Sequence, residues 1–106
     1  MTAFTLADLE AIIADRASAD GEASYTRSLM DKGVEKAAEK FGEEAVEAVI
    51  AAVAQDEAAV TGEAADVLYH MLVLLKLRDI PVADVMKELQ RRTGQSGHAE
   101  KAARQR

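Results

Sequence analysis

The chain has 106 residues, of which 49% are hydrophobic and 4% are aromatic, and it contains no cysteine. This length favours a single domain over residues 1–106, and the lack of cysteine excludes disulfides, thiolate zinc sites and thiol catalysis. The net charge of −6 argues against nucleic acid as a partner. We interpret the apolar runs as too short to span a bilayer, and no signal-peptide pattern appears. We therefore expect a cytoplasmic protein with no membrane partner.

The first half of the chain carries two short helix patterns and one long one. Thr5 is placed as the N-cap of a helix over residues 6–17, and a short helix is expected within residues 24–33. From residue 34 to about residue 55, apolar side chains recur at the helical period. This predicted stripe consists of Val34, Ala38, Phe41, Ala45, Val49, Ala52 and Val53.

The second half begins with another long helix, over residues 57–78. Its segment 67–77 is apolar almost all round, which is typical of a buried helix. Pro81 ends this pattern and starts a helix over residues 82–92, although a polar cap is expected where Pro81 stands. The basic tail 94–106 is expected to be flexible, with a last half-helix after residue 98.

These patterns predict an all-α bundle of four to five helices. The two long helices are expected to form a central antiparallel hairpin, because a turn-like segment at residues 55–57 separates them. One bundle of this length is too small to cover segment 67–77 on every side. We therefore expect a homodimer, with that helix near the interface.

Two acidic pairs at helical spacing stand out in the long helices: Glu44 with Glu47, and Glu63 with Asp66. The i,i+3 spacing puts both members of a pair on one helix face. Either pair alone is typical of a solvated helix face, but in a hairpin the four carboxylates can converge, and their repulsion then favours a bound cation. Oxygen ligands favour Mg²⁺, with Mn²⁺ as a substitute. Glu43 stands directly before the first pair.

A family resemblance rests on these acids and on their flanks. Residues 40–47 (Lys-Phe-Gly-Glu-Glu-Ala-Val-Glu), followed by residues 63–66 (Glu-Ala-Ala-Asp), resemble the E-x-x-E and E-x-x-D signature of MazG-type all-α nucleotide pyrophosphohydrolases. The flanks look like the phosphoribosyl-ATP pyrophosphohydrolases in particular. They comprise Ser24, Tyr25, Thr26, Leu29, residues 33–36, Arg92 and residues 96–101.

The resemblance implies hydrolysis of the α,β-anhydride of phosphoribosyl-ATP, which gives phosphoribosyl-AMP and pyrophosphate in the second step of histidine biosynthesis. It implies Mg²⁺ held by Glu44, Glu47, Glu63 and Asp66. Glu43 matches an additional acid, a candidate for binding a second ion or orienting water. Glu44 or Glu47 is the candidate catalytic base, since either carboxylate can take a proton from the attacking water.

Basic and aromatic residues supply the candidate substrate contacts. The full set is Lys36, Lys40, Tyr25, Thr26, Arg92, Ser96 and Lys101. Lys36 and Lys40 precede the acids by one or two turns and can reach phosphates beyond the metal. Arg92, Ser96 and Lys101 are candidates for binding the second phosphate or the phosphoribosyl group. Surface solvation is the competing interpretation of the basic residues, and core packing that of Tyr25.

Three other functions compete with this one. Relatives of the MazG type act on other nucleoside triphosphates, so a house-cleaning pyrophosphohydrolase is an alternative. A non-enzymatic helical dimer is a second. A di-iron bundle is a weaker third, because such sites use Glu-x-x-His and the fourth residue of each pair is an acid here. His70, on the apolar helix, is interpreted as a core or interface residue rather than a ligand.

Overall fold

The computed structural model describes residues 2–19, 24–94 and 104. Helices account for its regular structure, and no strand occurs in the described residues, which confirms the all-α prediction. The helices are α1 (Leu6–Ala17), α2 (Tyr25–Asp31), α3 (Val34–Ala54), α4 (Glu57–Leu77) and α5 (Val82–Thr93). Apart from Gly94 and Arg104, the predicted tail 94–106 lies outside the described residues.

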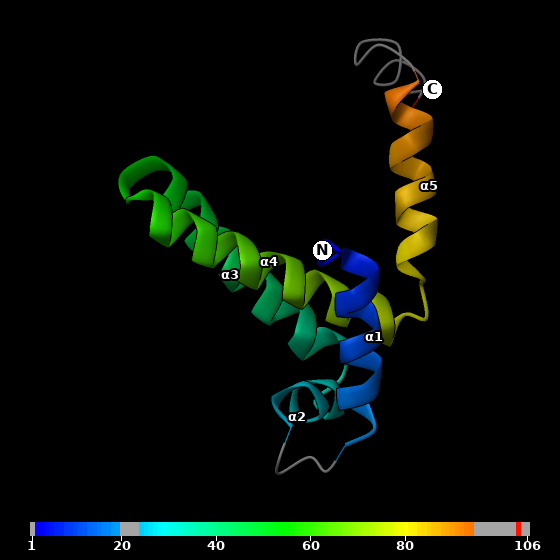
Figure 1. Cartoon of the computed structure of the whole chain (residues 1–106). Coiled ribbons are helices and arrows are strands. Elements are labelled where there is room, and N and C mark those ends of the chain that lie inside the picture. The colour runs from blue at the N-terminus through cyan, green and yellow to red at the C-terminus, as the bar shows by residue number, and fades with distance from the viewer. Residues whose placement is uncertain (1, 20–23, 95–103, 105–106) are drawn as a thin grey trace.

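The two long helices, α3 and α4, lie side by side as an antiparallel hairpin, as predicted (Figure 1). Helices α1 and α2 pack at the open end of this hairpin, where both contact α4. Helix α5 contacts α1 and projects away from α2 and from the closed tip of the hairpin. The hairpin is therefore the element that brings the two acidic pairs together.

Local chemistry sets the starts of the helices. The hydroxyl oxygen of Thr5 accepts a hydrogen bond from the backbone N–H of Asp8 at 3.1 Å, and the Asp8 carboxylate accepts from the backbone N–H of Thr5 at 2.9 Å. Asp56 caps α4 by accepting from the backbone N–H of Ala59 at 3.0 Å. Gly33 joins α2 to α3 with a φ of 90°, a backbone conformation that essentially only glycine adopts.

Helix α5 obtains its cap from a distant part of the chain. Pro81 occupies the N-cap position and offers no side-chain hydrogen bond. The Glu10 carboxylate of α1 instead accepts from the backbone N–H of Val82 at 2.8 Å. This contact replaces the polar cap that sequence reasoning expected at Pro81, and it joins the start of α5 to α1.

The core is small and lies where the five described helices meet, at the open end of the hairpin. Its buried members are Ile13, Leu29, Ala37, Leu72, Val73 and Val82. Leu72 and Val73 belong to the segment predicted to be buried on all sides. A single chain does not cover this segment on every side, as expected for one bundle of this length, because Leu68 of the same segment is 46% exposed.

The buried face of α3 also differs from the predicted apolar stripe. The residues that α3 buries are Ala37, Glu44 and Ala51, whereas Val53 of the stripe is 83% exposed. The physical reason is the close approach of α4, which favours small side chains between two packed helices. The branched side chains of the stripe, such as Val49, consequently face away from the hairpin contact.

Helix α4 is, by length and composition, the one described helix that could cross a membrane. The sequence interpretation that no apolar run reaches this length is therefore wrong. The criterion is weak, because the core helix of a soluble protein also meets it. Helix α4 packs along α3 and carries Glu63 and Asp66 within its length, which are costly in a bilayer.

Candidate active site

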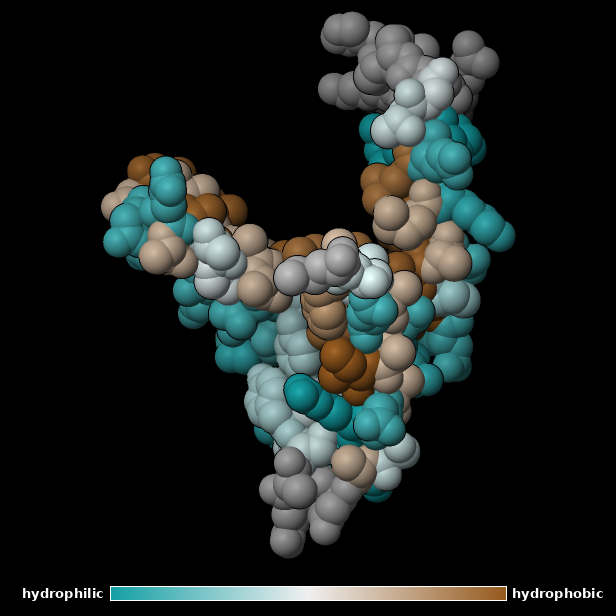
Figure 2. Space-filling view, viewed as in Figure 1, coloured by the Kyte–Doolittle hydropathy of each residue, from teal (hydrophilic) through white to brown (hydrophobic). Residues whose placement is uncertain are grey.

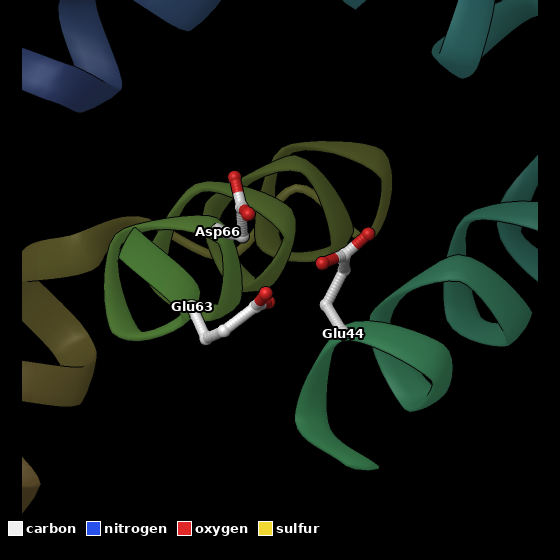
Figure 3. A group of neighbouring side chains, drawn as sticks. All are labelled: Glu44, Glu63 and Asp66. Carbon is white, nitrogen blue, oxygen red and sulfur yellow. The ribbon is translucent and has the colours of Figure 1, made fainter. Parts of the chain in front are cut away.

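Three carboxylates meet between the two long helices. Glu44 projects from α3, and Glu63 and Asp66 project from α4 (Figure 3). Each offers one oxygen, and these oxygens all lie within 4.8 Å of one another. Glu44 is only 7% exposed, Glu63 is half-buried and Asp66 is exposed, so the group is open to a ligand on one side.

The cluster has the features expected of a binding site for a divalent cation. Glu63 Oε2 is buried and has no hydrogen-bond partner among the described residues. A buried carboxylate oxygen without a partner is costly, and three carboxylates at this spacing also repel one another. A hard divalent cation with oxygen ligands removes both costs. The residues present therefore fit a metal ion of this class.

Glu47 lies one turn beyond Glu44 on α3, next to the cluster but outside the group of three. The charge of Glu44, and then that of Glu63, raises the pKa of the Glu47 carboxyl group, while Lys40 acts in the opposite direction. Glu47 is exposed. Its carboxylate is thus close enough to interact electrostatically with the cluster, and it is also accessible to water.

Lys40 connects the cluster to the neighbouring acid. Its ammonium nitrogen lies 3.2 Å from Glu44 Oε1 and 3.7 Å from Glu43 Oε2. The hydrogen bond to Glu44 is the main cause of a raised pKa of Lys40. Glu43 does not belong to the group of three, and its carboxylate lies on the Lys40 side. Lys36 pairs with Glu39 at 3.3 Å.

A pocket of about 260 Å³ lies beside the cluster, between α2 and the first half of α3. Lys36 and Lys40, both predicted to contact phosphates, line this pocket together with Tyr25. The other lining residues are Ser28, Leu29, Lys32, Glu39 and Glu43. Lysines, hydroxyl groups and carboxylates thus meet at one hollow, which suits an anionic ligand placed next to a metal site.

His70 and its neighbours form a polar chain behind the pocket. The Nδ1–H of His70 donates to the backbone carbonyl of Asp66 at 2.7 Å, and Nε2 of His70 lies 3.4 Å from the hydroxyl oxygen of Tyr25. Thr26 is buried, and its hydroxyl group forms a hydrogen bond with that of Tyr69. His70, also buried, has the satisfied core role that sequence reasoning favoured.

Residues 6–93 match the sequence profile of the family described as phosphoribosyl-ATP pyrophosphohydrolase. The chain belongs to this family. It is similar to curated proteins named phosphoribosyl-ATP pyrophosphatase. That of Agrobacterium fabrum is 62% identical over 104 residues, covering 98% of this chain and 97% of the relative. That of Azorhizobium caulinodans is 62% identical over 102 residues, covering 96% and 94%. That of Allorhizobium ampelinum is 59% identical over 104 residues, covering 98% and 100%.

This member of the phosphoribosyl-ATP pyrophosphohydrolase family thus has the family identity expected from its acidic motif and flanks. The structure does not bring every predicted site residue together. Arg92 lies on α5, bonded to Glu88 at 3.3 Å, and does not line the pocket. Ser96 and Lys101 lie outside the described residues.

Three residues that line the pocket were missed by sequence reasoning, namely Ser28, Lys32 and Glu39. Lysines recur at positions 32, 36 and 40, but the spacing of four gives no signal for Lys32, because Gly33 separates its helix from that of Lys36. Lys32 reaches the pocket from the end of α2, so its place there depends on the turn at Gly33.

Proposed function

We propose that this protein hydrolyses phosphoribosyl-ATP to phosphoribosyl-AMP and pyrophosphate in the cytoplasm, as the second step of histidine biosynthesis, and that Mg²⁺ is its metal ion. The observation that carries the proposal is the meeting of Glu44, Glu63 and Asp66 across the hairpin of a family member. A substrate with a triphosphate chain is strongly anionic. It therefore needs a cation in order to approach an acidic site.

Glu44, Glu63 and Asp66 would hold Mg²⁺, with Glu47 as the fourth candidate ligand. The unpartnered oxygen of Glu63 and the close spacing of the three carboxylates support this set. Mn²⁺ has a similar preference for oxygen ligands and is expected to substitute. Glu43 is kept as a candidate ligand of a second ion, because its carboxylate lies on the pocket side of the cluster, beside Lys40.

The bound ion would supply charge neutralisation at the phosphate oxygens and at the leaving pyrophosphate. The chain itself supplies the base. Glu47 is the better placed of the two candidates, because Glu44 is buried and bonded to Lys40 whereas Glu47 is exposed. Its carboxylate takes a proton from water as the water oxygen bonds to phosphorus, and the α,β-anhydride P–O bond breaks.

The pocket beside the cluster supplies the substrate contacts. Lys36 and Lys40 donate to phosphate oxygens, which is favourable because both partners are charged. Tyr25 presents an exposed ring at the pocket wall, where it can stack on a base. Thr26 acts indirectly, because its hydroxyl group is buried against Tyr69 and supports the helix that carries Tyr25.

A homodimer is part of the proposal. A single chain leaves large apolar side chains exposed on α3, α4 and α5, and Figure 2 shows apolar surface along the hairpin and along α5. These side chains are Val46, Val49, Ile50 and Val53 on α3, Leu68 and Met71 on α4, and Val85, Met86 and Leu89 on α5. A second copy would cover them. Roles for Arg92, Ser96 and Lys101 in substrate binding depend on the end of the chain, from α5 onward, contributing to a site in the dimer.

An assay of pyrophosphate release tests the proposal against its alternatives. The purified protein is given phosphoribosyl-ATP, and separately canonical and modified deoxynucleoside triphosphates, each with Mg²⁺. We expect the highest kcat/KM for phosphoribosyl-ATP. A preference for a deoxynucleoside triphosphate would instead support a house-cleaning enzyme, and no release from any of them would support the non-enzymatic dimer. Glu47→Ala separates the protein's own activity from contamination, because only the former is lost.

A further inference from the structure

The pocket beside the carboxylate cluster contains a lysine that the catalytic scheme does not use. Lys32 follows the last residue of α2, and the turn at Gly33 places it at the same hollow as Lys36 of α3. Ser28, one turn earlier on α2, lines the same hollow beside Leu29. This side of the pocket therefore carries a hydroxyl-bearing residue and a lysine, although the protein as a whole has a net charge of −6.

The lysines of this pocket differ in their partners. Lys36 is paired with Glu39, and Lys40 is paired with Glu43 and Glu44. The side chain of Lys32 makes no hydrogen bond or ion pair with any of the residues that the structure describes, although it shares the pocket with Glu39 and Glu43. Its ammonium group is consequently available to a ligand without first breaking an ion pair.

The chemistry of the proposed substrate calls for such a group. Phosphoribosyl-ATP carries a triphosphate chain and, on its second ribose, a separate 5′-phosphate. The carboxylate cluster can take the triphosphate only through a cation, and it repels any further phosphate. The separate phosphate therefore needs ammonium and hydroxyl donors a short distance from the cluster. The pocket offers both, and it adjoins the cluster through Lys40.

We propose that Lys32 and Ser28, together with Lys36, bind the 5′-phosphate of the phosphoribosyl group. This inference rests on the proposed function and deepens it, since it names the residues that separate phosphoribosyl-ATP from nucleotides without that group. Arg92 is a weaker candidate within one chain, because it bonds to Glu88 on α5, which projects away from α2. Lys32 is thus a specificity-determining residue, whereas the cluster binds the triphosphate chain of either kind of nucleotide.

Steady-state kinetics of Lys32→Ala test this assignment, with ATP as a competitive inhibitor that lacks the phosphoribosyl group. Loss of a hydrogen-bonded charge pair predicts a rise of about 10–100-fold in the KM for phosphoribosyl-ATP. The Ki of ATP should change by less than about threefold, because ATP makes no contact with Lys32 in this scheme. Lys32→Arg should recover most of the loss, and Ser28→Ala should raise KM by a smaller factor.

Lys87→Ala is the matched control, since it removes a lysine from the exposed face of α5, away from this pocket. The assignment is overturned if Lys32→Ala leaves KM as in the wild type, or if KM and the Ki of ATP rise together. Wild-type protein that releases no pyrophosphate from phosphoribosyl-ATP would instead defeat the proposed function, so the two failures are distinguishable.

A binding measurement extends the test without turnover. Ribose 5-phosphate is titrated into the protein while backbone amide signals are followed by NMR, with ribose as the control ligand. We expect the amide signals of Ser28, Lys32 and Lys36 to shift with ribose 5-phosphate and not with ribose. The affinity for ribose 5-phosphate should be weaker by about 10-fold or more in Lys32→Ala. Equal shifts with ribose, or shifts elsewhere only, would refute the assignment.

Discussion

The ammonium nitrogen of Lys40 lies 3.2 Å from Oε1 of Glu44, the most deeply buried carboxylate of the cluster. Glu44 therefore has a positive partner in the free protein, while Glu63 Oε2 has none among the described residues. A divalent cation at the cluster would compete with Lys40 for Glu44. Any weakening of that ion pair makes Lys40 more available to a phosphate, so cation binding and phosphate binding should support each other.

Neutral isosteres at the cluster should abolish turnover while the fold persists. Glu44→Gln and Asp66→Asn keep the size of each side chain but remove a charge that the cation needs. We expect pyrophosphate release to fall by about 100-fold or more, with the circular dichroism spectrum retained. A large loss of helicity would contradict this account, because it would mean that the acids are structural.

Glu47→Gln should raise the melting temperature of the metal-free protein at neutral pH. The charges of Glu44 and Glu63 raise the pKa of Glu47 above its ordinary value of 4.5, so ionisation of Glu47 opposes folding. The stability that this carboxyl group contributes when protonated is lost as the pH rises through its folded pKa. The gain from Glu47→Gln should therefore be present near pH 7 and disappear by about pH 4.

The control for this measurement is Glu35→Gln. Glu35 is an acid in the first turn of α3, where the helix dipole stabilises a negative charge, so its removal should not raise the melting temperature. Adding Mg²⁺ should reverse the advantage of Glu47→Gln, because the proposed Mg²⁺ site uses the negative charge of Glu47. An advantage that persisted unchanged with Mg²⁺ would argue against Glu47 as part of the metal site.

Gly33→Ala should destabilise the turn that places Lys32 beside Lys36. The φ of 90° at Gly33 is strained for any residue with a side chain, which predicts a loss of about 1–3 kcal/mol in the free energy of unfolding. Gly42→Ala is the contrasting change, because Gly42 is helical and an added Cβ meets nothing within 4 Å. It should stabilise by about 1 kcal/mol. Urea denaturation at one protein concentration measures the free energy of unfolding of both variants. Equal changes in the two variants would contradict the positive φ assigned to Gly33.

A charge on the exposed apolar face of α3 should weaken the proposed dimer. Ile50→Glu places a carboxylate among the exposed valines of α3, where a second copy would have to bury it. We expect the dissociation constant to rise by about 10-fold or more, measured by sedimentation equilibrium. Phe4→Glu is the control, since Phe4 is an exposed apolar residue that precedes α1. If Ile50→Glu left the dissociation constant of the dimer unchanged, the interface would lie elsewhere.

The helix boundaries were predictable because local chemistry decides them. The sequence shows the capping box of Thr5 and Asp8, the N-cap at Asp56 and the helix break at Pro81. The long helix predicted over residues 34–55 corresponds to α3, which spans Val34–Ala54. The two acidic pairs could also be located in this way, because i,i+3 spacing and one hairpin suffice to bring Glu44 near Glu63 and Asp66.

The buried face of α3 and the phosphate pocket were not predictable, because both depend on contacts between helices. Periodicity ranks Val53 above Ala51 by hydrophobicity, but the close approach of α4 buries the smaller residue. Lys32 joins the pocket through the turn at Gly33, whose direction no local pattern gives. The cap that Glu10 provides to Val82 spans 72 residues and has no sequence signature.

The central claim is that the carboxylates of the hairpin act through a divalent cation on the anhydride of phosphoribosyl-ATP. Its most direct test is the rate of pyrophosphate release from phosphoribosyl-ATP as Mg²⁺ is titrated into metal-free protein, for the wild type and for Glu63→Gln. We predict no release without Mg²⁺, a saturable rise in the wild type, and little or no rise in Glu63→Gln. Release that is independent of Mg²⁺, or a Glu63→Gln protein that matches the wild type at every concentration, would contradict the account.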